Sequence, residues 1–124
     1  MNRKWGVAGV IAVLLLPGLA QDQHSVSMRG NELAQHCEHV RNCEHRETCS
    51  DDDMMDFGMC TGYIMGVSDS TQRGVGLCVP TDVERGQMVK TVIKWMDENP
   101  NLLHHDADTV VVAALKAGFP CKRR

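Results

Sequence analysis

Six cysteines follow a short apolar leader, and this combination constrains the fold more than any other feature of the sequence. Residues 1–4 form a basic start, residues 5–16 an apolar run, and residues 18–20 the small-x-small pattern that signal peptidase recognises. We therefore expect a signal peptide over residues 1–20, cleaved before Gln21. Export places the cysteines in an oxidising compartment, where they can form disulfides.

The leader does not fit a membrane anchor. A helix needs about 20 apolar residues to cross a bilayer, whereas residues 5–20 are fewer and include Pro17 and Gly18. No cysteine ends the leader, so a lipid anchor is not indicated either. We expect an exported protein without a stable membrane anchor.

The rest of the chain is predicted to form one small acidic domain. Cleavage of 20 residues from 124 leaves 104, which suffices for a single core. Only two of the 13 basic residues lie in the leader, so 11 remain against 16 acidic residues, and nucleic acid is not an expected partner. Large rings are few in the core, and disulfides worth about 3 kcal/mol each would compensate for them.

The residue pattern predicts an all-α fold with four helices and no strand. Asn31 is a candidate N-cap for a first helix that ends before Ser50. Residues 54–68 form a second helix, with three aspartates, residues 51–53, at its positive end. Residues 70–80 contain Gly74, Gly76 and Pro80 and are expected to form a loop.

Two further helices follow this loop. Thr81 and Glu84 have the spacing of a capping box, which predicts that the third helix starts at Thr81 and stops at Asn99-Pro100. The fourth helix begins near Asp106 and has Gly118 at its C-cap. Apolar residues at helical spacing mark the buried faces of the last three helices: Phe57, Cys60, Ile64 and Val67; Val89, Val92, Ile93 and Met96; and Ala107, Val110, Val111, Ala114 and Leu115.

Gly58, Gly62 and Gly66 recur every four residues in the second helix, so one of its faces lacks side chains. Another backbone can approach such a face closely. We expect the glycines to pack against a second helix, either within the domain or across a homodimer.

The six cysteines admit 15 pairings, and sequence alone does not resolve them. Cys37 and Cys43 point in different directions around a continuous helix, which argues against a bond between them. Cys60 lies on the apolar face of the second helix, and Cys78 and Cys121 lie beside prolines. We favour the pairs Cys37–Cys60, Cys78–Cys121 and Cys43–Cys49.

Histidines surround the first cysteines, which raises the alternative of a metal site. His36, His39 and His45 alternate with Cys37, Cys43 and Cys49, and three methionines follow. Such ligands suit copper or zinc. However, the usual Cys-x2-Cys and His-x3-His spacings are absent, and oxidation removes thiolates as ligands. We therefore expect solvent-facing histidines beside disulfides, with no metal and no cofactor.

Catalytic patterns are weak. The segment Gly66–Ser70 resembles a nucleophile elbow, but it lacks the final glycine and no strand precedes it. His104-His105-Asp106 reads as an ordinary helix entry rather than a charge relay. We predict no catalytic residue and no enzyme activity.

Several short motifs occur together in an order that resembles the Rap/Tai family of type VI secretion amidase immunity proteins. They are residues 60–69, Cys78-Val79-Pro80, residues 87–90 leading to Trp95-Met96, Asn99-Pro100 and residues 117–121. Order, spacing and the Pro-Cys ending agree over roughly residues 31–121. The family-motif residues that we single out are Gly62, Tyr63, Gly66, Asp69, Pro80, Gln87, Pro100 and Pro120.

The resemblance implies a periplasmic helical protein, often a disulfide-crosslinked homodimer, that binds and occludes a cognate peptidoglycan amidase. It divides the chain into a signal peptide (1–20), a polar segment (21–30), a helical immunity domain (31–121) and a basic tail (122–124). The candidate partner contacts are Ser70, Thr71, Gln72 and Arg73, in the exposed loop. Cys43, Cys49 and the histidines around them depart from the family pattern.

Two other functions remain open at this point. A periplasmic acid-stress chaperone of the HdeA kind is also small, helical, exported and crosslinked. A periplasmic metal-binding protein would use the His36–Cys49 segment. Acid dissociation of a dimer would favour the chaperone, and bound metal would favour the metal carrier.

Overall fold

The structure is a computed structural model that describes residues 27–40, 43, 49–71 and 76–122. The predicted signal peptide lies outside the described residues. Within them the chain forms helices α1 (Gly30–Glu38), α2 (Asp51–Thr71), α3 (Arg85–Glu98) and α4 (Ala107–Gly118), with one short 3-10 helix, η3 (Pro100–Leu102). The only β pairing in the described part is an isolated bridge between Arg29 and Asp106. The predicted all-α fold of four helices is confirmed.

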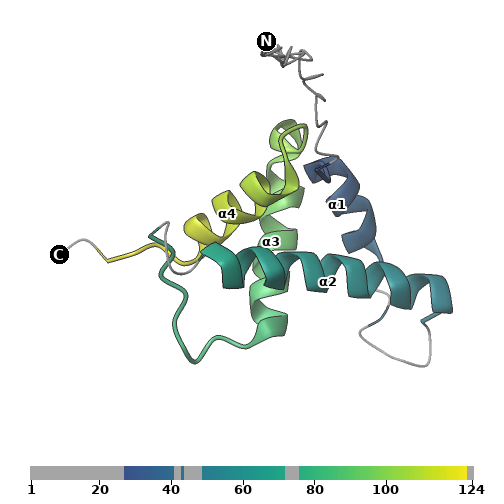
Figure 1. Ribbon diagram of the computed structural model, residues 1–124, viewed down its shortest axis with the longest axis horizontal. Coiled ribbons are helices and arrows are strands. Elements are labelled where there is room, and N and C mark those ends of the chain that lie inside the picture. Colours follow the sequence, from purple (N-terminus) through teal and green to yellow (C-terminus); the bar gives the residue numbers. More distant parts are fainter. Residues whose placement is uncertain (1–26, 41–42, 44–48, 72–75, 123–124) are drawn as a thin grey trace, which may run out of the picture.

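Helix α2 is the longest of the named elements; in Figure 1, α1 and α4 lie on one side of it and α3 crosses behind it. α1 packs against α2, α4 contacts both of them, and α3 packs against α4 and α2. None of the described helices is long and apolar enough to cross a membrane.

The predicted apolar faces of α3 and α4 are buried. Val92, Val111 and Leu115 have no exposed surface, and the other predicted members of both stripes are at most 8% exposed. In α2, Cys60 and Ile64 are fully buried, whereas Phe57 and Val67 are only partly buried. Sequence periodicity therefore identified the core correctly where each helix has one apolar face.

Helix α1 begins at Gly30, so the prediction of Asn31 as its N-cap is wrong. The first free amides of α1 bind backbone carbonyls from far along the chain instead of a side chain. Gly30 N–H donates to His105 O at 2.9 Å, and Asn31 N–H donates to Leu103 O at 2.8 Å. The predicted end of the helix before Ser50 is confirmed, because α1 stops at Glu38.

Helix α2 is longer than predicted at both ends: it continues to Thr71, so the first two residues of the predicted loop are helical, and it starts at Asp51 because Ser50 and Asp53 cap it. The Ser50 hydroxyl accepts a bond from Asp53 N–H at 3.2 Å, and Ser50 N–H donates to Asp53 Oδ2 at 3.1 Å. This reciprocal pair satisfies the amides that a helix start leaves unpaired. The three aspartates occupy the first turn, as predicted.

Helix α3 starts at Arg85, four residues after Thr81, so the predicted capping box is wrong. The residues after Pro80 form a turn instead, in which Val83 N–H donates to Pro80 O at 3.2 Å. The predicted stop is confirmed: the Asn99 side-chain amide donates to Trp95 O at 2.8 Å, and Pro100 begins η3.

Asp106 is the N-cap of α4, as predicted, but its side chain does not cap the helix. Its carboxylate accepts a bond from the Ser27 hydroxyl at 2.9 Å and pairs with Arg29 at 3.0 Å. Gly118 is the last helical residue rather than the C-cap, which is Phe119. A Cβ on Gly118 would lie 2.3 Å from Thr91 Cγ2, so this glycine allows close contact between α4 and α3.

The prediction that the α2 glycines pack against another helix of the same domain is wrong. A Cβ built on Gly58, Gly62 or Gly66 meets nothing within 4 Å. The glycine face of α2 therefore points away from the rest of the described chain, and the homodimer alternative stays a prediction.

All three favoured disulfides are present. They join Cys37 to Cys60, Cys43 to Cys49 and Cys78 to Cys121, with Cα atoms 5.0 to 5.1 Å apart, and no cysteine is free. Cys37–Cys60 is the buried bond, because its two residues are at most 1% exposed.

The contact at Gly118 predicts that Gly118→Ala destabilises the protein. Alanine favours a helix over glycine by up to about 1 kcal/mol, but the new methyl overlaps Thr91, whose hydroxyl donates to Gln87 O at 2.9 Å and holds the side chain. We expect a net loss of about 1 kcal/mol in the free energy of unfolding, measured by urea denaturation.

Two matched variants test the cause. Thr91→Ser removes the clashing methyl and should restore stability to Gly118→Ala. Gly62→Ala, with no neighbour within 4 Å, should stabilise the monomer by about 0.5 to 1 kcal/mol. Equal effects at Gly118 and Gly62 would contradict the predicted overlap.

Candidate partner-binding site

The predicted partner-contact residues lie where α2 ends. Ser70 and Thr71 are its last two residues, and both hydroxyls donate to Val67 O, at 2.9 and 2.6 Å. Gln72 and Arg73 lie outside the described residues. The structure therefore places the first half of the predicted contact set at an accessible helix end.

The chain after this loop is fixed to the body of the protein. Gly76 has φ +67°, a left-handed conformation that favours glycine, and Leu77 is only 8% exposed. Cys78 is bound to Cys121 near the end of the chain. A shallow groove of about 410 Å³ lies beside Ser70 and Thr71, between α2 and α4. Its other lining residues are Val67, Asp108, Thr109, Val112, Ala113 and Lys116.

An apolar face of α2 is exposed in the described structure. Met55 is 71% exposed and Met59 44%, and both lie in the same helix as the open glycine positions. Exposed apolar surface of this kind is typical of a protein interface.

The other family-motif residues have mixed positions. Asp69, Pro80, Gln87, Pro100 and Pro120 are exposed at helix ends and turns. Tyr63 is partly buried against the core. Burial and the nearby Asp108 carboxylate raise the pKa of the Tyr63 hydroxyl above its ordinary value of 10.0.

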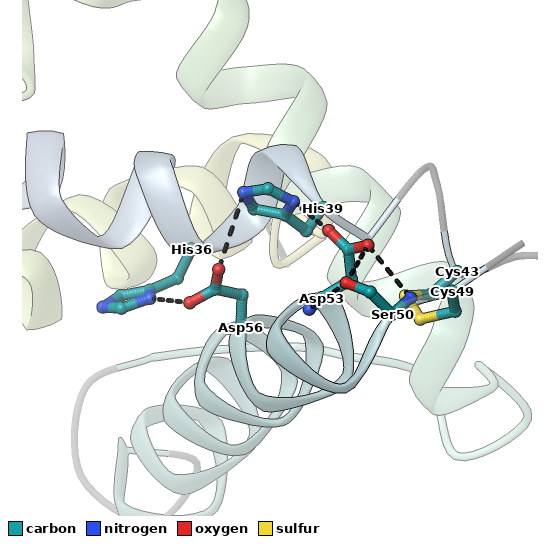
Figure 2. A network of polar contacts seen from close by, with 7 residues as sticks. All are labelled: His36, His39, Cys43, Cys49, Ser50, Asp53 and Asp56. Carbon is teal, nitrogen blue, oxygen red and sulfur yellow. Dashed lines mark hydrogen bonds and ion pairs between the residues drawn. A yellow bond between two sulfur atoms is a disulfide. The ribbon is translucent and has the colours of Figure 1, made fainter.

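The side chains of His36 and His39 are 27% and 38% exposed, and they bond to aspartates of α2 instead of standing free in solvent as expected (Figure 2). His45 lies outside the described residues. His36 Nδ1 lies 2.7 Å from Asp56 Oδ1, and His39 Nδ1 bonds to Asp53 Oδ1. His39 Nε2 also lies 3.5 Å from Asp56 Oδ2. The sequence signal for these contacts is matched spacing. His36 in α1 and His39 at its C-cap are three residues apart, as are Asp53 and Asp56 in α2.

The bonds of His36 and His39 to aspartates hold the end of α1 against α2. Among the described residues, no three histidine, cysteine or acidic side chains are placed to hold a metal ion.

His104 Nδ1 bonds to Asn101 O at 2.9 Å, and the Asp106 carboxylate bonds to Ser27 and Arg29. The His104-His105-Asp106 sequence is therefore part of a helix entry, as expected.

The capping bonds at Asp53 predict acid sensitivity. Bonds from the Ser50 hydroxyl, the Ser50 amide and His39 hold the pKa of Asp53 below its ordinary value of 3.8. Because the folded pKa is the lower one, this stabilisation is present above the unfolded pKa and is lost as pH falls through the folded pKa.

The stability difference between wild type and Asp53→Asn should therefore be constant above about pH 5 and shrink below about pH 4. Urea denaturation at stepped pH measures this difference, with the neighbouring Asp52→Asn as control; a difference that does not change with pH would contradict the linkage.

Comparison with known proteins identifies the family. The family model of Rap1a immunity proteins matches residues 29–121, which include all four helices and all six cysteines. No curated protein matches the chain. The match agrees with the resemblance seen in the motifs, and an immunity protein is not an enzyme. The chain therefore belongs to the Rap1a immunity protein family.

Proposed function

We propose that this protein is a periplasmic immunity protein that binds a cognate type VI secreted peptidoglycan amidase and blocks access to its active site. The family match over residues 29–121 carries the proposal, because proteins of this family neutralise amidase effectors. The three disulfides support a location in an oxidising compartment, and the leader sequence supports export to the periplasm.

The proposed mechanism is steric. The immunity protein docks over the cleft in which the amidase binds its peptide substrate, and it performs no reaction itself. A crosslinked helical scaffold suits this role because little conformational entropy is lost when a rigid surface docks. The net negative charge of the mature chain would speed the encounter with a basic enzyme surface.

We assign the docking contacts to the connection that begins at Ser70 and Thr71 and includes Gln72 and Arg73. This connection joins two points that the structure fixes, the end of α2 and the Cys78–Cys121 disulfide. The adjacent groove beside α4 could receive a side chain of the enzyme.

The active form in this proposal is a homodimer that pairs the glycine faces of α2. Gly58, Gly62 and Gly66 have open space where a Cβ would be, and exposed methionines lie on the same helix. Two such helices can approach closely and bury the methionines between them.

The docking assignment predicts that deleting Thr71–Gly74 abolishes binding to the amidase. Tagged oxidised protein, residues 21–124, is exposed to periplasmic and secreted proteins of its own organism, and the retained proteins are identified by mass spectrometry. A stoichiometric cell-wall hydrolase supports immunity, and its inhibition is then measured on peptidoglycan. Many partners retained only after acidification would indicate a chaperone instead.

Two controls isolate the loop. Gln72→Gly with Arg73→Ser keeps the loop length and should also weaken binding strongly. Thr81→Gly with Asp82→Ser alters an exposed turn elsewhere in the chain and should not. All variants must keep the three disulfides and the wild-type circular dichroism. Full binding by the deletion variant would remove the loop assignment and leave the family assignment unchanged.

The dimer proposal predicts that Gly62→Leu yields a monomer, because the new side chain separates the two helices. Sedimentation equilibrium measures the oligomeric state. Gly86→Leu is the matched control, since Gly86 lies in α3 and also has open space at its Cβ position. A wild-type protein that is monomeric at micromolar concentration, or a dimeric Gly62→Leu variant, would exclude the α2 interface.

A further inference from the structure

The large apolar side chains that the described structure leaves exposed are three methionines of α2. Met54 and Met59 are both 44% exposed, and Met55 is 71% exposed. The methionines of α3 lie in the core instead: Met88 is 5% exposed and Met96 2%. Access of solvent to sulfur therefore separates two groups of methionines within one chain.

The exposed methionines lie beside the open glycines of α2. Because a helix has about 3.6 residues per turn, residues four apart follow one another in a row along its surface. Met54 is four residues before Gly58, the first of the glycines, and Met55 and Met59 form the adjacent row. Neither row contains a charged residue from Met54 to Gly66. Glycines and thioethers thus form one uncharged strip along α2.

The sulfur of this strip can be oxidised, whereas the cysteines are already committed. All six cysteines form disulfides, so no free thiol competes for an oxidant. A peroxide transfers one oxygen atom to a thioether: the O–O bond breaks, an S–O bond forms and water leaves. Sulfur loses two electrons and the peroxide gains them. The product, a sulfoxide, is polar where the thioether was apolar.

We propose that Met54, Met55 and Met59 form a methionine-oxidation site that controls the pairing of two copies of this chain through α2. This inference rests on the dimer in the proposed function. In the dimer the glycine row lets two backbones approach closely, and the thioethers pack against the partner helix. A sulfoxide oxygen buried there loses its hydrogen bonds to water, so oxidised chains stay apart. Oxidation acts on free monomers and prevents them from pairing again.

The test treats the mature protein, residues 21–124, with hydrogen peroxide. Peptide mapping by mass spectrometry locates the sulfoxides, and sedimentation equilibrium measures the dissociation constant of the dimer. Below this constant, we expect the three exposed methionines to be oxidised at least about 10-fold faster than Met88 and Met96. Well above it, pairing should protect the exposed methionines. Full oxidation of the strip should raise the dissociation constant at least about 10-fold.

Three variants separate oxidation of the strip from oxidation elsewhere. Leucine at all three exposed positions keeps the strip apolar without sulfur, so this variant should stay dimeric after peroxide. The matched control, Met28→Leu with Met96→Leu, keeps the strip intact and should dissociate as wild type does. Met55→Gln with Met59→Gln makes the strip polar and should be monomeric without peroxide. Each variant must keep the wild-type circular dichroism.

Two results would overturn the inference while the α2 dimer stands. One is dissociation of the triple-leucine variant by peroxide, and the other is a wild-type dimer that persists with sulfoxide at all three positions. Equal oxidation rates at exposed and buried methionines would also contradict the site. A wild-type protein that is monomeric before oxidation would refute the proposed dimer and this inference with it. Amidase binding by that monomer would leave the immunity function in place.

Discussion

The disulfide between Cys37 and Cys60 is the contact on which the rest of the structure depends. It joins α1 to the middle of α2 inside the core, with both residues at most 1% exposed. By fixing one point of contact, it sets the register in which His36 and His39 meet Asp56 and Asp53 on the adjacent turns. A crosslink of this span restricts the unfolded chain, and the His–Asp contacts then orient α1 along α2.

Backbone hydrogen bonds to a distant segment hold the N-terminal end of α1. The segment from Met28 to Asn31 exchanges backbone hydrogen bonds with residues 103–107, including Ala107 N–H to Met28 O at 2.8 Å. The short helix α1 is therefore fixed at both ends by residues distant in sequence. An isolated helix of nine residues would be marginal in water, so these contacts account for its persistence.

The sequence predicted those features that depend on one chain segment at a time. The apolar stripes of α3 and α4, the stop at Asn99-Pro100 and the acidic first turn of α2 follow from helical spacing and local propensity. Tertiary contacts overrode local rules elsewhere. The backbone N–H of Asn31 donates to Leu103 O, and Asn31 lies inside the helix that it was expected to cap. A turn after Pro80 takes the place of the predicted capping box. The loop predicted over residues 70–80 starts too early, because α2 continues to Thr71, and Gln72 and Arg73 lie outside the described residues.

The chemistry of the described chain is largely committed to holding the fold. All six cysteines form disulfides, His36 and His39 bond to aspartates between two helices, and Asp106 pairs with Arg29. Groups that an enzyme would need free are thus used as crosslinks. What the described fold leaves available is surface: the open glycine face of α2 and the groove beside Ser70 and Thr71. A protein that works by blocking another needs this kind of surface on a rigid support, since stiffness reduces the entropy lost on docking and shape with charge selects the partner.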